Sequence, residues 1–158
     1  MRKRRSLTLD SGRFLALRIV IAAALGVSAV IHIQLAPTYQ QAAPGGIGQG
    51  TLFLVQAGAA ILTAVVVLLR GSRASFAAAA IVGLSSLAAV IVYRYIQVPA
   101  IGPLPSMYEP VWYTAKVITA VAEAAAGGLA ILEYALVRKT RQKPRRRRMP
   151  ASTPTPAE

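Results

Sequence analysis

Hydrophobic residues in this chain gather into four long runs that are separated by short polar or proline-containing segments. The runs cover about residues 14–35, 51–69, 74–95 and 112–137. An α-helix needs roughly 20 residues to cross the hydrocarbon layer of a bilayer, and each run is close to that length. The pattern therefore predicts an all-α polytopic membrane protein, folded as a bundle of four transmembrane helices.

The segments outside these runs complete the predicted organisation. Residues 1–13 are polar and basic, which indicates a cytoplasmic arm, and residues 138–158 form a basic, proline-rich tail. Too few apolar residues remain in this tail to bury a core, so we expect it to be disordered. Segments 36–50 and 97–110 contain several prolines and glycines, and such residues favour loops over helices.

An alternative exists for the first run. A basic start, an apolar centre and small residues near Ala42 and Ala43 also fit a signal peptide that is cleaved off. The run is longer than the usual signal-peptide core of roughly 7–15 residues, which favours a retained helix. Either outcome leaves the orientation of the later runs unchanged.

The distribution of positive charge predicts that orientation. The chain has 18 Lys and Arg residues, and all except Arg94 and Lys116 lie before or at the start of the first run, between the second and third runs, or after the fourth. Positive residues are enriched on the cytoplasmic side of membrane proteins, so we expect both termini in the cytoplasm. Aromatic residues fall at both interfaces, as aromatic belts do. Phe14, Phe76 and Tyr134 lie near the inner interface. Those at the outer interface are Tyr39, Tyr93, Tyr95, Tyr108, Trp112 and Tyr113.

Composition narrows the range of partners. Hydrophobic residues make up 55% of the chain and charged residues only 15%, which is a membrane-like balance. The net charge of +13 does not indicate nucleic acid, because the basic residues lie at span ends and in tails, where they set topology. The expected partner is the lipid bilayer. A membrane-protein partner or a second copy of the chain stays open.

The basic tail offers one lipid-binding candidate. Arg145, Arg146, Arg147 and Arg148 follow one another and could bind anionic lipid head groups, at about 1 kcal/mol per basic residue near the surface. The alternative is a plain topology anchor that is otherwise solvated.

Glu123 is the strongest candidate for function within the runs, because an ionisable residue costs on the order of 2.5–3.5 kcal/mol at the centre of a bilayer. It lies nine residues beyond Thr114, or roughly 14 Å deep at the helical rise per residue. A carboxylate at this depth needs a neighbouring cation or a bound proton. Glu123 therefore predicts either a proton-exchanging or ligand-binding carboxyl group, or a group that pins helices together.

Polar residues from the other spans cluster at a similar depth. Lys116 shares a helical face with Glu123 but lies about 10 Å further out, so we expect its ammonium group to extend outward instead of pairing with the carboxylate. The clustering predicts a ligand-binding or proton-exchanging site in the outer half of the bundle. Its expected members are Glu123, Arg94, His32, Gln56 and Lys116.

Alternatives remain for individual members of this cluster. His32 could be a hydrogen-bonded imidazole without a ligand, and Arg94 could be a surface anchor. Glu133, near the inner boundary, is expected to pair with Arg138 or with the Arg70 and Arg73 turn.

No catalytic or metal-binding motif is found in the sequence. The chain has no Cys and one His, which cannot ligate haem from both sides or build a closed zinc site. No nucleophile with a neighbouring base and no phosphate-binding loop occurs either. We expect a protein without enzymatic activity, cofactor or resident metal.

One segment carries a resemblance to a known family. The stretch from Tyr93 through Gly102-Pro103-Leu104-Pro105 and Met107-Tyr108-Glu109-Pro110-Val111-Trp112, followed by Lys116 and Glu123, resembles a family of small, uncharacterised four-span membrane proteins of GC-rich bacteria. The resemblance implies four helices and an inner-membrane location, and it brings no activity with it. A weaker similarity to DoxX-like four-helix proteins rests on residues 116–132.

Three functional hypotheses follow. The leading one is a membrane protein that binds or conducts a small ligand or proton through its polar outer half-bundle. The second is a structural or assembly subunit in which the same residues lock the bundle. The third is a quinone-linked, DoxX-like redox accessory.

Overall fold

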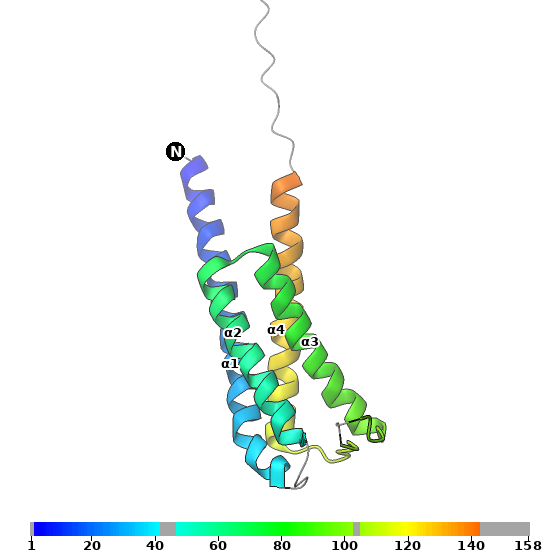
Figure 1. The fold of residues 1–158 in the computed structure, drawn as a ribbon. Helices are drawn as coiled ribbons and strands as arrows, with labels where there is room; N and C mark the ends of the chain where they lie inside the picture. Colours follow the sequence, from blue (N-terminus) through cyan, green and yellow to red (C-terminus); the bar gives the residue numbers. More distant parts are fainter. Residues whose placement is uncertain (1, 42–46, 103–104, 143–158) are drawn as a thin grey trace, which may run out of the picture.

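The computed structural model describes residues 2–41, 47–102 and 105–142, and within the helices at the two chain ends it describes side chains from Gly12 to Arg138. Figure 1 shows four long helices. They are α1 (Arg2–Gln41), α2 (Gln49–Arg70), α3 (Arg73–Tyr95) and α4 (Thr114–Gln142). Each contains a stretch that is long and apolar enough to cross a membrane: Gly12–Gln41, Gln49–Arg70, Arg73–Tyr95 and Thr114–Arg138. The predicted all-α, four-helix, multi-pass membrane architecture is confirmed.

The bundle has two ends that differ in what they carry. At one, which we call the terminal end, α1 begins, α2 turns into α3, and α4 finishes. At the other end, which we call the loop end, the chain passes from α1 to α2 and from α3 to α4 (Figure 1). Helix α1 packs against α2 and α4, and α3 packs against α4, whereas α2 and α3 contact each other less. Figure 1 shows α2 and α3 diverging from their shared turn toward the loop end.

Small residues fill the centre of the bundle while large apolar ones face outward. Most of the buried core consists of alanine, with a few larger side chains such as Ile21, Leu25 and Phe76. By contrast, Leu69 is 77% exposed and Ile81 is 68% exposed. Small residues let transmembrane helices approach closely, and exposed large apolar side chains suit a lipid surrounding.

Helices α3 and α4 approach each other closely at a glycine. A Cβ placed on Gly83 would lie 3.0 Å from the carbonyl oxygen of Glu123 and 3.1 Å from the backbone nitrogen of Gly127. Only glycine leaves room for the two backbones at this distance. The contact fixes α3 against the part of α4 that carries Glu123.

The turn between α2 and α3 is held by a residue from α1. Gly71 adopts φ 51°, and its backbone N–H donates to the carbonyl oxygen of Val67. Arg18 donates through Nε to the same oxygen at 3.0 Å and through its guanidinium to the carbonyl of Leu68. The last carbonyls of a helix lack partners within the helix and carry partial negative charge, so a cation stabilises them.

Two helices extend beyond the predicted spans. Helix α1 begins at Arg2, inside the segment 1–13 that was expected to be an arm, and α4 continues to Gln142, past the expected start of the tail at residue 138. The remainder of the tail, including the candidate lipid contacts Arg145, Arg146, Arg147 and Arg148, lies outside the described residues.

The prediction of a loop from residue 36 is wrong, because α1 continues through Pro37 to Gln41. Proline removes one hydrogen bond within the helix, but contacts to α2 hold the last turn. The Tyr39 ring packs on Phe53 with centroids 4.9 Å apart. Gln40 accepts hydrogen bonds from the backbone N–H and the hydroxyl of Thr51, each at 3.1 Å.

The segment between α3 and α4 contains a short antiparallel bridge. Val98 and Met107 exchange backbone hydrogen bonds of 3.0 and 2.9 Å. The backbone N–H of Glu109 then donates to the carbonyl of Tyr93, at 2.8 Å, close to the end of α3. These bonds return the chain over the loop end and place Glu109 next to the helices.

Candidate functional site

A cavity of about 240 Å³ lies in the half of the bundle nearer the loop end. All four helices and the segment before α4 contribute to its lining, which is mainly apolar and aromatic. Such a lining with a few polar groups is typical of small-ligand sites in proteins. The residues on which the argument depends are His32, Tyr39, Phe53, Gln56, Ser85, Ser86, Tyr93, Glu109, Tyr113, Lys116 and Thr119.

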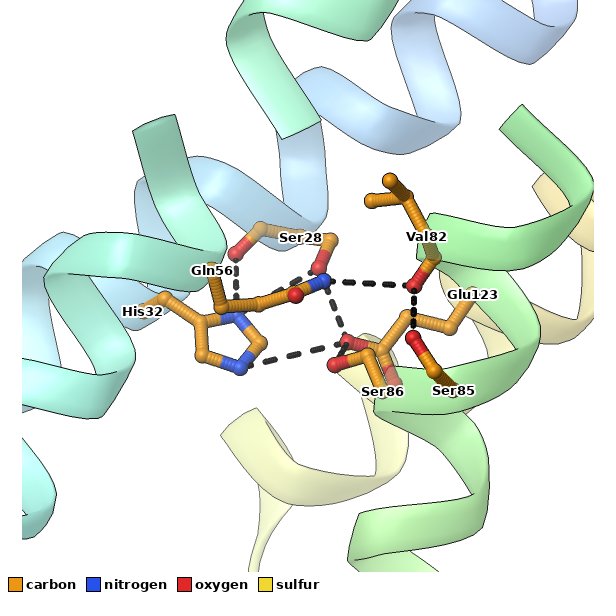
Figure 2. A network of polar contacts seen from close by, with 7 residues as sticks. All are labelled: Ser28, His32, Gln56, Val82, Ser85, Ser86 and Glu123. Atoms are coloured by element: carbon orange, nitrogen blue, oxygen red, sulfur yellow. Dashed lines mark hydrogen bonds and ion pairs between the residues drawn. The ribbon is translucent and has the colours of Figure 1, made fainter. Parts of the chain in front are cut away.

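A hydrogen-bonded cluster centred on Glu123 forms the base of this cavity (Figure 2). Ser28 of α1 donates from Oγ to Oε1 of Glu123 at 2.9 Å, and Ser86 of α3 donates from Oγ to the same oxygen. Glu123 is 0% exposed. It does not line the cavity itself, but its partner Ser86 and its neighbour His32 do. The cluster therefore connects α1, α3 and α4 directly beneath the cavity.

The orientation of His32 fixes the position of one of its protons. Nδ1 lies 2.8 Å from the carbonyl oxygen of Ser28, and a carbonyl oxygen can only accept, so Nδ1 carries a hydrogen. The opposite nitrogen, Nε2, faces Oε1 of Glu123 at 3.9 Å (Figure 2). Nε2 can accept a hydrogen bond when the ring is neutral, or share a proton with the carboxylate when it is charged.

Two buried polar atoms near the base have no protein partner. Oε2 of Glu123 and the hydroxyl oxygen of Thr119 are buried and make no hydrogen bond within the described part of the chain. Thr119 is 4% exposed and lines the cavity. Buried polar atoms are normally hydrogen-bonded, so unsatisfied ones beside a cavity indicate a missing partner.

Gln56 joins α2 to α3 at the side of the cavity. Its Nε2 donates to the carbonyl oxygen of Val82 at 3.4 Å, and the hydroxyl of Ser85 donates to the same oxygen at 3.3 Å (Figure 2). Ser85 is exposed and also lines the cavity. The cavity thus reaches the outside of the bundle along α3.

A second polar cluster forms the rim. Tyr39 donates from its hydroxyl to Oε2 of Glu109 at 2.8 Å, and this hydroxyl lies 3.0 Å from that of Tyr113. Lys116 donates from Nζ to the carbonyl oxygens of Glu109, at 2.5 Å, and Val111, at 3.3 Å. As expected from the sequence, the ammonium group extends toward the loop end and forms no ion pair with Glu123.

The five residues predicted for the site do not all meet. His32, Gln56 and Lys116 line the cavity, and Glu123 lies at its base. The structure does not bring Arg94 to the cavity lining. Its guanidinium lies over the ring of Tyr95 instead, 5.0 Å from the centroid.

Several site residues were missed by sequence reasoning. Ser28 precedes His32 by four residues and so shares its helical face, a signal that the sequence does contain. Thr119 likewise precedes Glu123 by four residues. Ser86 has no such signal, because hydroxyl groups are common in transmembrane helices. Tyr39 and Tyr113 were noted only as interfacial aromatic residues, and Glu109 only within the resemblance.

The expected ion pair of Glu133 is not present among the described residues. Both carboxyl oxygens of Glu133 are buried without a hydrogen-bond partner there. Arg73 donates to the hydroxyl of Tyr134 at 3.1 Å and covers its ring instead. The prediction is wrong because Glu133 shares the buried face of α4 with Ala126 and Ala130, so its side chain faces the core and not the basic turn.

Within the described residues, no group of three His, Cys, Asp or Glu side chains could hold a metal ion. No family model matches the chain, and no curated protein or solved structure proves similar to it. The resemblance to four-span proteins of GC-rich bacteria therefore stays a prediction.

Proposed function

We propose that this chain is a plasma-membrane protein that binds a small ligand in the cavity near the loop end. One observation carries the proposal: a cavity with aromatic walls is lined by the buried Thr119 hydroxyl, which has no partner among the described residues, and the buried carboxyl group of Glu123 lies directly behind its base. A buried carboxyl group is costly within a membrane, and binding a ligand would offset that cost. The His32 imidazole and the Ser86 hydroxyl connect this carboxyl group to the cavity.

Binding is better supported than proton conduction. The hydrogen bonds found at the base end at Glu123. Beyond it, toward the terminal end, the buried polar side chains Thr63, Ser75 and Glu133 lie among apolar ones such as Ala126, Ala130 and Phe76, and no hydrogen bond in the described residues links them to Glu123. A conducting path needs a continuous series of polar groups, and the hydrogen bonds of the described core form no such series.

The orientation in the membrane follows from charge. The terminal end carries the basic residues Arg70 and Arg73 and the basic segments of both termini, so it faces the cytoplasm of a bacterial cell. The cavity then opens on the outer side of the inner membrane. Alkaline phosphatase should be active when it is fused at Gly46 or Ser106 and inactive when it is fused at Ser72. The reverse pattern would contradict this orientation.

A cavity-filling substitution tests ligand binding whatever the identity of the ligand. Ala89 lines the cavity, whereas its neighbour Ala88 is exposed and faces away. Mass spectrometry of protein extracted from native membranes should detect a small molecule with the wild type and with Ala88→Phe, and lose it with Ala89→Phe. If all three proteins carry the same small molecules, or none carries any, the proposal fails.

A structural or assembly subunit is the second candidate, and one observation favours it. The Glu123 cluster joins three helices through the hydroxyl groups of Ser28 and Ser86, as a purely structural lock would. In that case Glu123→Ala lowers the abundance of the protein without a separate loss of binding.

A further inference from the structure

An open hollow lies at the terminal end of the bundle, where α3 begins beside α4 (Figure 1). We call it the terminal hollow. Its volume is about 480 Å³, and it is lined by Ser72, Arg73, Ala74 and Ala77 at the start of α3 and by Tyr134 of α4. No residue lines both this hollow and the cavity near the loop end, so the two can be tested independently.

Arg73 brings a positive charge to the hollow that no described carboxylate neutralises. Its guanidinium group lies over the ring of Tyr134, 5.0 Å from the centroid, and donates to the Tyr134 hydroxyl at 3.1 Å. A guanidinium group has five N–H donors, so this bond leaves most of them over. Only Nε is both unpartnered and buried, and the accessible free donors therefore belong to the terminal nitrogens. Glu133, next to Tyr134 in the sequence, is fully buried and forms no ion pair with Arg73.

The backbone at the start of α3 adds donors beside Arg73. Ser72 caps the helix: its hydroxyl accepts from the N–H of Ser75 and its carbonyl oxygen from the N–H of Phe76. The N–H groups of Arg73 and Ala74 come before these, and the first N–H groups of a helix have no partner within it. Both residues line the terminal hollow, so an anion bound to Arg73 also meets the positive end of α3.

Two further cations flank the residues of the hollow. Arg70 ends α2 three residues before Arg73, and Arg138 follows Tyr134 by four residues, on the same face of α4. Both are exposed, and neither forms an ion pair within the described part of the chain. This concentration of positive charge favours a ligand with a net negative charge over one whose phosphate is neutralised by an ammonium group.

The apolar side of the hollow continues along α3 into the membrane. Ala74, Ala77 and Ile81 share one face of α3, because they are three and four residues apart. Ile81 is 68% exposed, and Ile131, three residues before Tyr134 on α4, is 51% exposed. A hydrocarbon chain that covers this surface gains from burying it, whereas a free phosphate ion gains nothing.

The depth of Arg73 also suits a lipid. It is the first residue of the apolar stretch Arg73–Tyr95, so it lies at the membrane boundary, where lipid phosphates lie, in either orientation of the chain. Basic pockets between transmembrane helices at this level are suited to lipid head groups.

We infer that the terminal hollow binds an anionic glycerophospholipid, such as phosphatidylglycerol, by its phosphate group. The phosphate accepts hydrogen bonds from the terminal nitrogens of Arg73 and from the start of α3. Tyr134 holds the guanidinium group in place, and one acyl chain lies along Ala74, Ala77 and Ile81.

Native mass spectrometry of the full-length, delipidated protein in detergent tests this assignment. Two lipids with the same acyl chains serve as probes, dioleoylphosphatidylglycerol and dioleoylphosphatidylethanolamine. Two soluble probes, glycerophosphoglycerol and inorganic phosphate, carry the same phosphate chemistry without the chains. The wild type should bind phosphatidylglycerol at least about fivefold more tightly than phosphatidylethanolamine, and it should not bind the soluble probes.

Variants assign the binding to the hollow. Arg73→Gln should weaken binding of phosphatidylglycerol by about fivefold or more, as expected for one basic residue at a membrane surface. Arg13→Gln removes the same charge from an exposed position outside the hollow and should bind like the wild type. Ala74→Phe fills the hollow without changing its charge, and it keeps the test decisive if Arg73→Gln does not fold. It should weaken binding too, whereas Ala88→Phe, at an exposed position nearer the other end of α3, should not.

Four results would overturn the inference. Equal binding of the two lipids would remove the selectivity for negative charge, and equal weakening by Arg13→Gln and Arg73→Gln would show a general attraction to the basic end of the protein. Tight binding of a soluble probe would make the hollow a site for free phosphate. A dimer that Ala74→Phe dissociates, with lipid binding unchanged, would make the hollow an interface between two copies of the chain. The cavity near the loop end is unaffected by any of these results, because Ala89→Phe tests it separately.

Discussion

Replacing Gly83 by alanine tests whether the close contact of α3 with α4 holds the bundle together. The new Cβ would lie 3.0 Å from the carbonyl oxygen of Glu123, 3.1 Å from the backbone nitrogen of Gly127 and 3.4 Å from its Cα. All three neighbours are backbone atoms, so no side-chain rotation can relieve the contact. The helices must move apart, and Ser86 then moves relative to Glu123.

Two opposing effects decide the size of the change. Alanine favours a helix interior over glycine by about 1 kcal/mol. Forcing one extra carbon into a tightly packed site costs roughly 1–3 kcal/mol. Gly128 is a matched control on α4, because a Cβ there meets no atom within 4 Å. Since both substitutions gain the same helix preference, their difference in unfolding free energy isolates the contact and should be about 1–3 kcal/mol.

Thermal unfolding in detergent, followed by circular dichroism at 222 nm, measures this difference. Gly128→Ala should unfold at or above the temperature of the wild type, and Gly83→Ala below it. Gly58→Ala provides a second control, because its Cβ also meets no atom within 4 Å. If Gly83→Ala proves as stable as Gly128→Ala, the two helices are not in backbone contact and the argument is refuted.

Three further substitutions probe other contacts. Glu133→Met should raise the unfolding free energy by about 1–3 kcal/mol in chemical denaturation, because it removes buried carboxyl oxygens that lack partners in the described structure. An unfolding free energy below that of the wild type would show that Glu133 has a stabilising partner. Arg18→Met should lower the unfolding free energy by about 1–3 kcal/mol, since two carbonyls at the end of α2 lose a charged donor. Arg13→Met, at an exposed position, should change the unfolding free energy little. Tyr39→Phe should speed amide hydrogen exchange around Glu109, because its hydroxyl no longer holds that residue, and unchanged exchange would contradict the contact.

The overall architecture could be predicted from the sequence because it depends on local composition. A helix of about 20 apolar residues satisfies its own backbone within lipid, whatever its neighbours are. The ends of the helices depend on contacts between segments and were predicted less well. Helix α1 passes through Pro37 because Tyr39 and Gln40 bind residues of α2, which no local pattern indicates.

The candidate site shows the same division. Glu123 and His32 could be singled out because ionisable groups in an apolar run are rare and costly. Hydropathy gives the depth of a residue, but the rotation of each helix about its axis decides which side chains meet. Glu133 was therefore placed correctly in its helix and wrongly assigned to basic partners, and Arg94 lies over Tyr95 outside the cavity lining.

Glu123 allows the two functional candidates to be separated by a pair of substitutions. Both serine hydroxyls donate to the same oxygen, Oε1. A glutamine keeps an oxygen that can accept these bonds, so Glu123→Gln removes the charge and preserves the connection among α1, α3 and α4. Glu123→Leu removes both the charge and the acceptor.

The two candidates then predict different results for these variants. If the cluster is only a lock, Glu123→Gln should behave like the wild type in every assay, while Glu123→Leu lowers abundance in the membrane and the unfolding temperature. If the carboxylate binds a ligand, Glu123→Gln should keep wild-type abundance and still lose the molecule that co-purifies with the protein. Quantitative immunoblotting of membranes, together with mass spectrometry of the same purified samples, measures both properties. Loss of abundance in Glu123→Gln equal to that in Glu123→Leu would contradict the hydrogen-bonding pattern on which both candidates depend.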